Sequence, residues 1–468
     1  MPKARKTVLR IPRIRPWRIT LSGNSGKKTY SGVSYLTILY GFTCVIGIGT
    51  ILLMLPISSR SGELTPFVDA LFTSTSAVCV TGLVVVDTGT YWSPFGQATI
   101  LALIQIGGFG FMTSATLFLL VLGRRIGLRE RLLIGESMGQ HGMGGVVRLI
   151  KRMAVFTLVV EALASLVFFI HFTTQEPAGT AAWKSVFQAV SAFNNAGFDI
   201  FGNFRSLLNY QSDSLVIVIT AVLIFLGGIS YIVIADVVRS LRWNRLSLDS
   251  KIVLTTTGIL LFSGMAIVLL TEYNNAATIG PMAWPGKLLN AFFHSVTART
   301  AGFSTIGISN LADYSLFFVI LLMFIGGASG STAGGIKVNT FGILAAAIWS
   351  SLRGREHPRA FDREFMTHHI YRALTIGILS LTFIAIVVLL LTVTEKFHFL
   401  NLLFESFSAF GTVGLSTGIT PNLSIAGQLI IAVTMFVGRL GPLTLALVLV
   451  QRQRTTAYRY PKETVRIG

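Results

Sequence analysis

Charged residues are scarce in this sequence. Only 12% of its 468 residues are Asp, Glu, Lys or Arg, whereas 52% are hydrophobic and the mean hydropathy is +0.70. A soluble domain of ordinary composition carries about 25% charged residues. This scarcity excludes an ordinary soluble protein and indicates that most of the chain lies in a lipid bilayer.

Cysteines and the common catalytic motifs are also nearly absent. The two cysteines, Cys44 and Cys79, lie in apolar segments, cannot form a disulfide framework and lack the spacing of a metal site. The sequence has no HExxH or GxxxxGKS/T motif. We expect its seven histidines to lie in loops or at interfaces. We therefore expect no enzymatic activity and no tightly bound cofactor.

Acidic residues are half as numerous as basic ones. The chain has 19 Asp and Glu against 38 Lys and Arg, for a net charge of +19. The positive-inside rule places the basic loops and both termini in the cytoplasm, in a protein of the inner (cytoplasmic) membrane. We expect these loops to contact anionic membrane lipid or a cytosolic protein rather than nucleic acid. The basic clusters lie at 3–28, 124–131, 148–152, 239–251, 353–372 and 452–466.

Eight apolar stretches are long enough to cross a bilayer core of about 30 Å. They lie at 35–56, 95–122, 149–171, 214–239, 252–271, 314–350, 372–394 and 424–450. Between the two members of each pair lies a shorter segment, at 67–80, 182–194, 287–300 and 399–412. At about 1.5 Å per residue, a helix of that length reaches roughly the middle of the membrane. Each short segment therefore predicts a re-entrant helix and loop, buried in protein or lining a cavity.

The short segments contain four diverged copies of one motif. Each copy has a Phe followed ten residues later by a Gly, and these glycines are 115, 105 and 112 residues apart. A fixed period of about 110 residues indicates one structural unit used four times. The copies are FTSTSAVCVTGL from Phe72, FQAVSAFNNAGF from Phe187, FFHSVTARTAGF from Phe292 and FESFSAFGTVGL from Phe404.

The pattern predicts an all-α integral membrane protein with eight transmembrane helices. Four fused helix–pore-loop–helix repeats would surround a central pore. The predicted divisions are a basic cytoplasmic arm at 1–34, repeats at 35–131, 132–245, 246–355 and 356–450, and a cytoplasmic tail at 451–468.

The repeated glycines fit a cation selectivity filter. A ring of backbone carbonyls can replace the water around a cation without placing a formal charge in the membrane. Gly tolerates the backbone dihedrals that such a ring needs, and each half-helix directs its negative dipole end to the same place. The alternative is that each Gly merely permits a tight turn. The predicted filter segments are Val80-Thr81-Gly82, Asn195-Ala196-Gly197, Thr300-Ala301-Gly302 and Thr412-Val413-Gly414.

These four segments resemble the filters of the Trk/Ktr/HKT superfamily of potassium transporters, and the resemblance extends over residues 35–450. Thr412-Val413-Gly414 is the segment most similar to a potassium-channel filter. With eight spans, the chain is most similar to the membrane subunit of bacterial Ktr systems. The resemblance implies channel-like uptake of potassium, the permeant ion bound at filter carbonyls, with sodium as an activator. It also implies a homodimer on a cytosolic nucleotide-binding regulatory ring, a separate polypeptide because this chain shows no nucleotide-binding fold.

The first full helix of each repeat is called its opening helix below, and the second its closing helix. The closing helix of the third repeat contains a glycine-rich stretch that is unsuited to a helix. It predicts a break in mid-membrane, below the filter, and a loop that gates the pore; the alternative is a helix of small residues packed on a neighbour. The first two closing helices carry glycine pairs, Gly107-Gly108 and Gly227-Gly228, which predict close helix packing. The predicted gate comprises Gly327, Ala328, Ser329, Gly330, Ser331, Thr332, Ala333, Gly334, Gly335 and Arg439.

Four charged or titratable residues near the predicted pore need an assignment. Arg439 stands where other copies have Gly, and a charge inside a membrane helix is functional by default. We favour gating for Arg439, with an ion pair to a carboxylate such as Glu161 or Asp236 as the alternative. Lys337 is predicted to be a snorkelling anchor. Glu405 and His294 are predicted to face the outside, either enriching cations at the entrance or simply solvated.

A sodium-coupled secondary cation transporter with alternating access is the alternative function. Such transporters also break helices near the midplane, usually in two inverted halves. Four parallel copies at similar spacing favour a pore instead.

Overall fold

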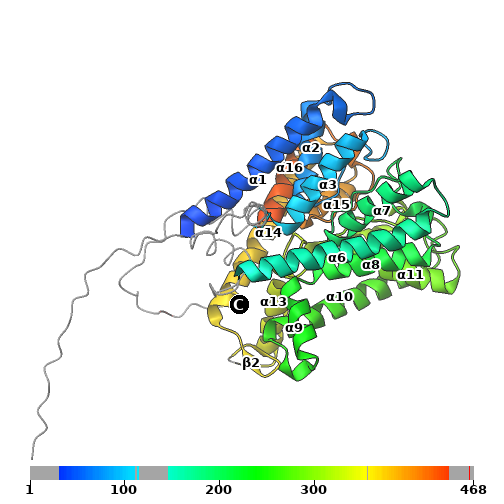
Figure 1. The fold of residues 1–468 in the computed structure, drawn as a ribbon. Helices are drawn as coiled ribbons and strands as arrows, with labels where there is room; N and C mark the ends of the chain where they lie inside the picture. The colour runs from blue at the N-terminus through cyan, green and yellow to red at the C-terminus, as the bar shows by residue number, and fades with distance from the viewer. Residues whose placement is uncertain (1–30, 111–112, 115–145, 356, 442–462, 464–468) are drawn as a thin grey trace, which may run out of the picture.

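The structure, a computed structural model, describes residues 31–110, 113–114, 146–355, 357–441 and 463. Most of the predicted basic arm, the loop at 124–131 and the tail at 451–468 lie outside these residues. Helices dominate the described chain, and the strands are β1 (Arg359–Ala360) and β2 (Arg363–Glu364), paired antiparallel in a small hairpin. Figure 1 shows the helices gathered in one bundle, with β2 and α9 at the same end.

The helices alternate between longer elements and half-length ones. Single 3-10 turns occur at Pro56–Ser58, Leu208–Tyr210, Trp243–Arg245, Ile308–Asn310 and Thr420–Asn422. The α-helices are α1 (Ser31–Met54), α2 (Phe67–Cys79), α3 (Pro94–Phe109), α6 (Val146–Phe172), α7 (Ala178–Phe193), α8 (Ser214–Gly228), α9 (Tyr231–Ser240), α10 (Leu248–Glu272), α11 (Trp284–Thr297), α12 (Asp313–Phe324), α13 (Val338–Leu352), α14 (Thr367–Thr394), α15 (Phe399–Gly411) and α16 (Ile425–Leu440).

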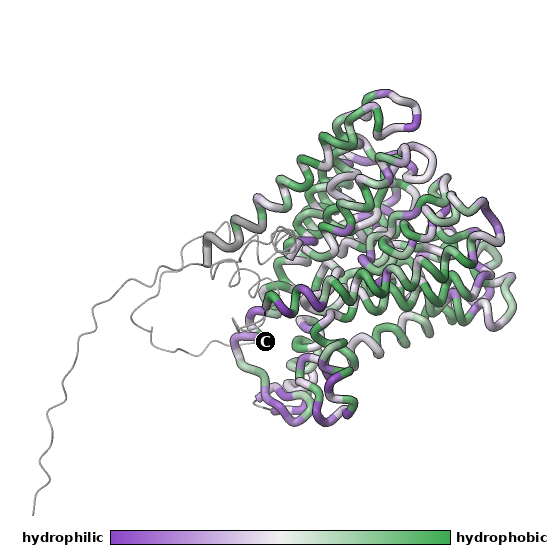
Figure 2. The backbone as a smooth tube through the Cα atoms, viewed as in Figure 1, coloured by the Kyte–Doolittle hydropathy of each residue, from purple (hydrophilic) through white to green (hydrophobic). Residues whose placement is uncertain are grey.

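Apolar residues cover the lengths of the helices, and polar residues concentrate in the loops at their ends (Figure 2). Among the described residues, the helices α6, α10 and α14 are long and apolar enough to cross a membrane, and α8 with α9 would make a fourth span. The others are shorter apolar helices. An all-α membrane architecture is therefore confirmed, whereas the full set of eight spans stays a prediction.

The predicted continuous span at 214–239 is wrong, because the second closing helix is broken into α8 and α9. The chain bends by 95° between α8 and α9, at Ile229 and Ser230, where Ser230 has a φ of 44°. The carbonyls of Gly227 and Gly228, at the end of α8, accept hydrogen bonds from the segment between α12 and α13. The break is thus stabilised by a distant part of the chain, which periodicity within the helix does not reveal.

The third closing helix is broken as predicted. It ends at Phe324 and resumes at Val338. The intervening residues 325–337, called the break loop below, are closed at their base by the amide of Gly326, which donates to the carbonyl of Ile336 at 2.8 Å. The alternative of a continuous helix of small residues is wrong.

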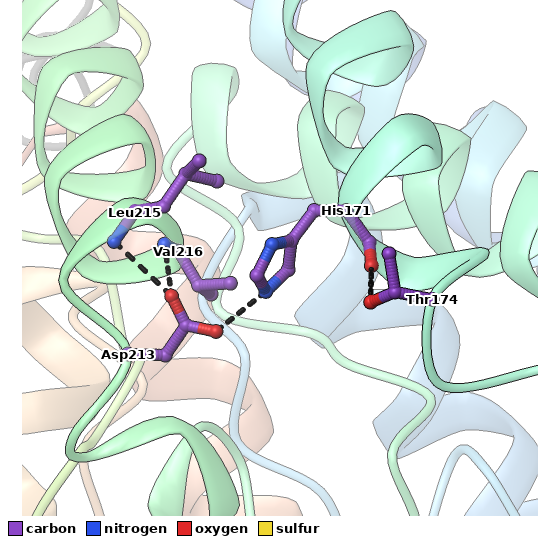
Figure 3. Close-up of polar contacts among 5 residues, drawn as sticks. All are labelled: His171, Thr174, Asp213, Leu215 and Val216. Carbon is purple, nitrogen blue, oxygen red and sulfur yellow. Dashed lines mark hydrogen bonds and ion pairs between the residues drawn. The ribbon is translucent and has the colours of Figure 1, made fainter.

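Capping side chains tie opening helices to closing helices at one end of the bundle. Asp213 precedes α8 and accepts the amides of Leu215 and Val216 at 3.1 and 3.2 Å. Its other carboxylate oxygen lies 2.5 Å from Nε2 of His171 at the end of α6 (Figure 3). Glu395, directly after α14, accepts the amide of Ser424 before α16 in a similar way. Asp213 thus caps α8, and Glu395 holds Ser424, which is the N-cap of α16.

Replacing Asp213 by alanine is expected to lower the thermal midpoint of unfolding. The change removes an N-cap, worth about 1–2 kcal/mol, together with the contact to His171. Thermal unfolding in detergent would measure it. Asp313→Ala is the control, because Asp313 begins α12 and makes no capping hydrogen bond. Equal losses in the two variants would contradict the capping assignment.

Candidate functional site

The four half-length helices α2, α7, α11 and α15 lead into loops with the same unusual backbone. Shortly after each helix comes a non-glycine residue of positive φ, followed two residues later by a glycine of positive φ. Only glycine adopts this left-handed region without strain. The φ values are 57°, 59°, 73° and 49° at Val80, Asn195, Thr300 and Thr412, and 92°, 71°, 78° and 89° at Gly82, Gly197, Gly302 and Gly414.

The four glycines meet in a closed ring. A Cβ atom added to each glycine would strike the carbonyl oxygen of the residue that precedes the next glycine. The added atoms of Gly82, Gly197, Gly302 and Gly414 would lie 2.4, 2.9, 2.7 and 2.1 Å from the oxygens of Ala196, Ala301, Val413 and Thr81, respectively. This arrangement, called the glycine ring below, brings all four predicted filter segments together and leaves no room for a side chain.

A hydroxyl group of each half-length helix binds the filter segment or the residue directly after it, a contact that the sequence pattern did not predict. Ser76 and Ser408 accept the amides of Gly82 and Gly414 at 3.1 and 3.2 Å. Ser191 and Thr297 instead donate to the carbonyls of Phe198 and Phe303, both at 2.6 Å. A serine six residues before the glycine in three copies is a signal that could have revealed these ties.

Neutral oxygen atoms are the ligands that the glycine ring offers. The four carbonyls lie against the neighbouring glycines. The buried hydroxyls of Thr81, Thr300 and Thr412 have no hydrogen-bond partner among the described residues. Within the same residues, no three His, Cys, Asp or Glu side chains come together to hold a metal. Such a set of oxygens suits a dehydrated monovalent cation.

The break loop lies against the filter segments. A Cβ added to Gly334 would lie 2.1 Å from Oγ1 of Thr412, and one added to Gly326 would lie 3.3 Å from Cγ2 of Thr300. Both threonines stand two residues before a glycine of the ring, next to the end of a half-length helix. The loop therefore sits where the filter segments leave their helices.

Several elements hold the break loop in place. The amides of Ala328 and Thr332 donate to the carbonyls of Gly228 and Gly227 at 2.9 and 3.3 Å. The amide of Ser329 donates to Oδ1 of Asn339 at 2.9 Å. The remaining predicted gate residues, Gly327, Gly330, Ser331, Ala333 and Gly335, belong to the same loop, where Gly330 and Gly335 have positive φ.

Arg439 joins the loop to two closing helices. From α16, its guanidinium donates to the carbonyl of Thr332 in the loop and to that of Gly107 in α3. The alternative of an ion pair is wrong for the described residues, since Glu161 instead accepts from Asn194 and Gln105, and Asp236 accepts from serines.

Three other predictions about polar residues need correction. Lys337 donates to the carbonyl of Ala333 inside the loop, so it is not a snorkelling anchor. Glu405 and His294 are each only 1% exposed rather than facing the outside. Glu405 accepts from Ser416, Thr417 and Thr420 and so supports the loop after the fourth filter segment. The burial of Glu405 and His294 could not be predicted, because the position of a residue along a helix does not say which face of that helix packs against the core.

The glycine pairs pack closely, as predicted. A Cβ at Gly107 would lie 2.1 Å from the carbonyl oxygen of Val78, and one at Gly227 would lie 1.9 Å from that of Phe193. Gly438 approaches the carbonyl of Phe410 in the same way, at 2.0 Å. Each contact joins a closing helix to the half-length helix of its own unit.

Two carboxylates lie in the loops that follow the first two filter segments. Asp87 accepts the amides of Thr90 and Phe204, both at 2.8 Å, and thereby joins the two loops. Asp199 accepts the amide of Phe201 at 3.0 Å. Burial raises the pKa of Asp199 to about 7, and the nearby charge of Asp87 acts in the same direction.

This shifted pKa predicts a pH-dependent uptake of cations. As pH rises through about 7, Asp199 becomes negative, and a negative charge beside the filter loops attracts cations. Uptake should increase between about pH 6 and pH 8, and Asp199→Asn should flatten that increase. Asp199 keeps its proton to a higher pH in the folded state than in the unfolded chain. Its contribution to the free energy of unfolding therefore falls as pH rises towards 7. An unchanged pH profile in the variant would contradict this assignment.

Comparisons with known proteins show the family of the chain. The model of the family TrkH, described as a cation transport protein, matches residues 20–456. The Ktr system potassium uptake protein B of Bacillus subtilis (strain 168) is 42% identical over 428 residues, which cover 92% of this chain and 95% of that protein. The potassium/sodium uptake protein NtpJ of Enterococcus hirae is 39% identical over 434 residues, covering 92% and 96%.

A solved structure shows the same fold. The potassium transporter TrkH from Vibrio parahaemolyticus matches with a TM-score of 0.69 at 20% identity, over 90% of this chain and 86% of that one. The family match and the identities confirm the resemblance to Trk and Ktr proteins that the repeated motif predicted. This chain is a member of the TrkH family of membrane cation transport proteins.

Proposed function

We propose that the protein takes up potassium across the cytoplasmic membrane through the glycine ring, which acts as a four-segment selectivity filter. The closed ring of glycines and carbonyl oxygens is the observation that carries this proposal. The names of the similar proteins from Bacillus subtilis and Enterococcus hirae support potassium as the ion. Potassium would bind at the carbonyls, with the unpartnered threonine hydroxyls as further ligands.

The proposed architecture has four fused repeats, at 35–131, 132–245, 246–355 and 356–450, and eight spans with both termini in the cytoplasm. Each repeat contributes one half-length helix and one filter glycine. The similar ties from Ser76, Ser191, Thr297 and Ser408 support four equivalent units around one axis.

The break loop and Arg439 form the gate in this proposal. The loop lies against Thr412 and Thr300, where the filter segments leave their helices. A loop in that position obstructs ion movement between the filter and the cytoplasm. Its glycines allow displacement, and Arg439 holds it in the obstructing position.

A sodium-coupled transporter with alternating access is the second candidate. The observation that favours it is the pair of broken helices, α8–α9 and α12–α13, in two successive units. Transporters of this kind use broken helices in corresponding positions of two halves. Sodium as an activating ion, without fixed coupling, belongs to the first candidate.

The proposed partners are a second copy of the chain, anionic lipid and a cytosolic nucleotide-binding regulatory ring. The similar proteins named as parts of Ktr systems support a multi-subunit assembly. The turn after α9 exposes Leu241 and Trp243 beside Arg242 and Arg245. Aromatic and basic side chains together suit an anionic membrane surface or an acidic protein surface.

Rubidium uptake into potassium-loaded liposomes separates the two candidates. The filter proposal predicts uptake that is driven by the potassium gradient and continues without sodium. The coupled transporter predicts uptake that stops without sodium and moves sodium and rubidium in a fixed ratio. A purified protein that moves no alkali cation would overturn both.

A further inference from the structure

Arg299 is a buried positive charge beside the third filter segment, where it directly precedes Thr300. Only 8% of Arg299 is exposed. The corresponding positions in the other copies hold Cys79, Asn194 and Gly411, so the charge is peculiar to the third copy, whose closing helix is interrupted by the break loop.

The guanidinium of Arg299 has few partners. Its Nη2 lies 3.4 Å from Oγ1 of Thr257 in α10 and 3.4 Å from the carbonyl oxygen of Gly326. Its Nε has no partner, and no carboxylate pairs with it among the described residues. A buried charge is costly unless it is compensated, and the nearby C-terminal end of α11 compensates part of it. The Gly326 carbonyl is therefore an important acceptor for this side chain.

Gly326 is the first glycine of the break loop. Its amide closes the base of the loop on Ile336, and its Cβ position would lie 2.1 Å from the carbonyl oxygen of Gly334. A displacement of the loop that opens this base also moves the Gly326 carbonyl away from Arg299. Two arginines thus hold the loop, Arg439 at Thr332 and Arg299 at Gly326.

We propose that Arg299 is a positioning residue that couples the third filter segment to the break loop. The inference rests on the proposed gate and goes beyond it, because it connects the state of the gate to the filter. With the loop in place, Arg299 spans the loop base and α10, next to Thr300. When the loop leaves, the guanidinium keeps only the hydroxyl of Thr257, and the support of Thr300 changes.

A double-mutant cycle tests this coupling. Arg299→Gln, a deletion of residues 329–335, and their combination are compared by rubidium flux and by the ratio of rubidium to sodium flux in liposomes. Arg299→Gln should raise flux about fivefold or more, the scale of typical coupling between sites, and should lower the selectivity ratio. In the deleted background the same substitution should change neither quantity further. If the shortened chain does not fold, a second cycle that combines Arg299→Gln with Arg439→Gln replaces it. The effects of these two substitutions on flux should likewise be non-additive.

The outcomes separate the coupling from the gate. If the deletion alone leaves flux unchanged, the proposed gate is wrong. If the deletion raises flux but Arg299→Gln has the same effect in both backgrounds, Arg299 acts only through its charge near the ions and the coupling is wrong. Thr257→Val, which removes the acceptor outside the loop, is the matched control and should leave the response to the deletion intact.

Discussion

Alanine in place of Gly414 is expected to reduce potassium flux by at least about tenfold. The new Cβ would lie 2.1 Å from the carbonyl oxygen of Thr81 and 3.2 Å from Cα of Gly302. Gly414 also has a φ of 89°, where a non-glycine residue costs about 1–2 kcal/mol. Because about 1.4 kcal/mol corresponds to tenfold in rate, the strain and the displaced carbonyl together should disable the filter. Rubidium uptake into liposomes measures the loss.

Gly418 offers a matched control for this substitution. It lies four residues later in the same loop and has a φ of 91°, but a Cβ there would meet nothing within 4 Å. Gly418→Ala therefore brings similar backbone strain without touching the glycine ring, and it should keep most of the flux. Equal losses in the two variants, or full flux in Gly414→Ala, would contradict the role assigned to the ring.

Glutamine in place of Arg439 is expected to raise cation flux by about tenfold or more. Arg439 donates to the carbonyl of Thr332 in the break loop and to that of Gly107 in α3, so its two bonds together tie the loop to the closing helices. A hydrogen bond from a charged group is worth about 1.5–3 kcal/mol, so losing both should shift the loop strongly towards the displaced state. Flux through the purified variant, normalised to folded protein, measures the shift.

The control for Arg439 is Arg205→Gln. Arg205 is exposed in the loop before α8, so its substitution changes net charge by the same amount without touching the break loop. Its flux should stay near that of the unaltered protein. Lower or unchanged flux in a folded Arg439→Gln protein would show that the arginine does not hold a gate closed.

The parts of the fold that repeat along the chain could be predicted from the sequence. The ten-residue spacing from Phe to Gly located α2, α7, α11 and α15, and the glycines of positive φ that follow them. The glycine-rich stretch at 326–335 predicted the break between α12 and α13, because glycine destabilises a helix wherever it lies. Both signals depend only on residues close together in the sequence, so they can be read without knowing how the helices pack.

The parts that depend on contacts between distant segments could not be predicted. The bend after Gly228 is stabilised by amides from the break loop, about a hundred residues later. Arg439 binds carbonyls rather than a carboxylate, and every residue offers a carbonyl, so sequence gives no hint of which one it meets. Glu405 is predicted to face the outside, but the hydroxyls of Ser416 and Thr420 that bind it in the interior lie beyond the filter segment.

The selectivity of Gly302→Ser tests the central claim most directly. A serine Cβ would lie 2.7 Å from the carbonyl oxygen of Val413 and 2.9 Å from Cα of Gly197, so the change alters three segments of the glycine ring at once. The measurement is rubidium uptake into liposomes with potassium or sodium as the competing ion, for the unaltered protein and the variant. A filter predicts that potassium competes far better than sodium in the unaltered protein and that the serine variant loses this preference. The same ratio in both proteins would contradict the glycine ring as the selectivity filter.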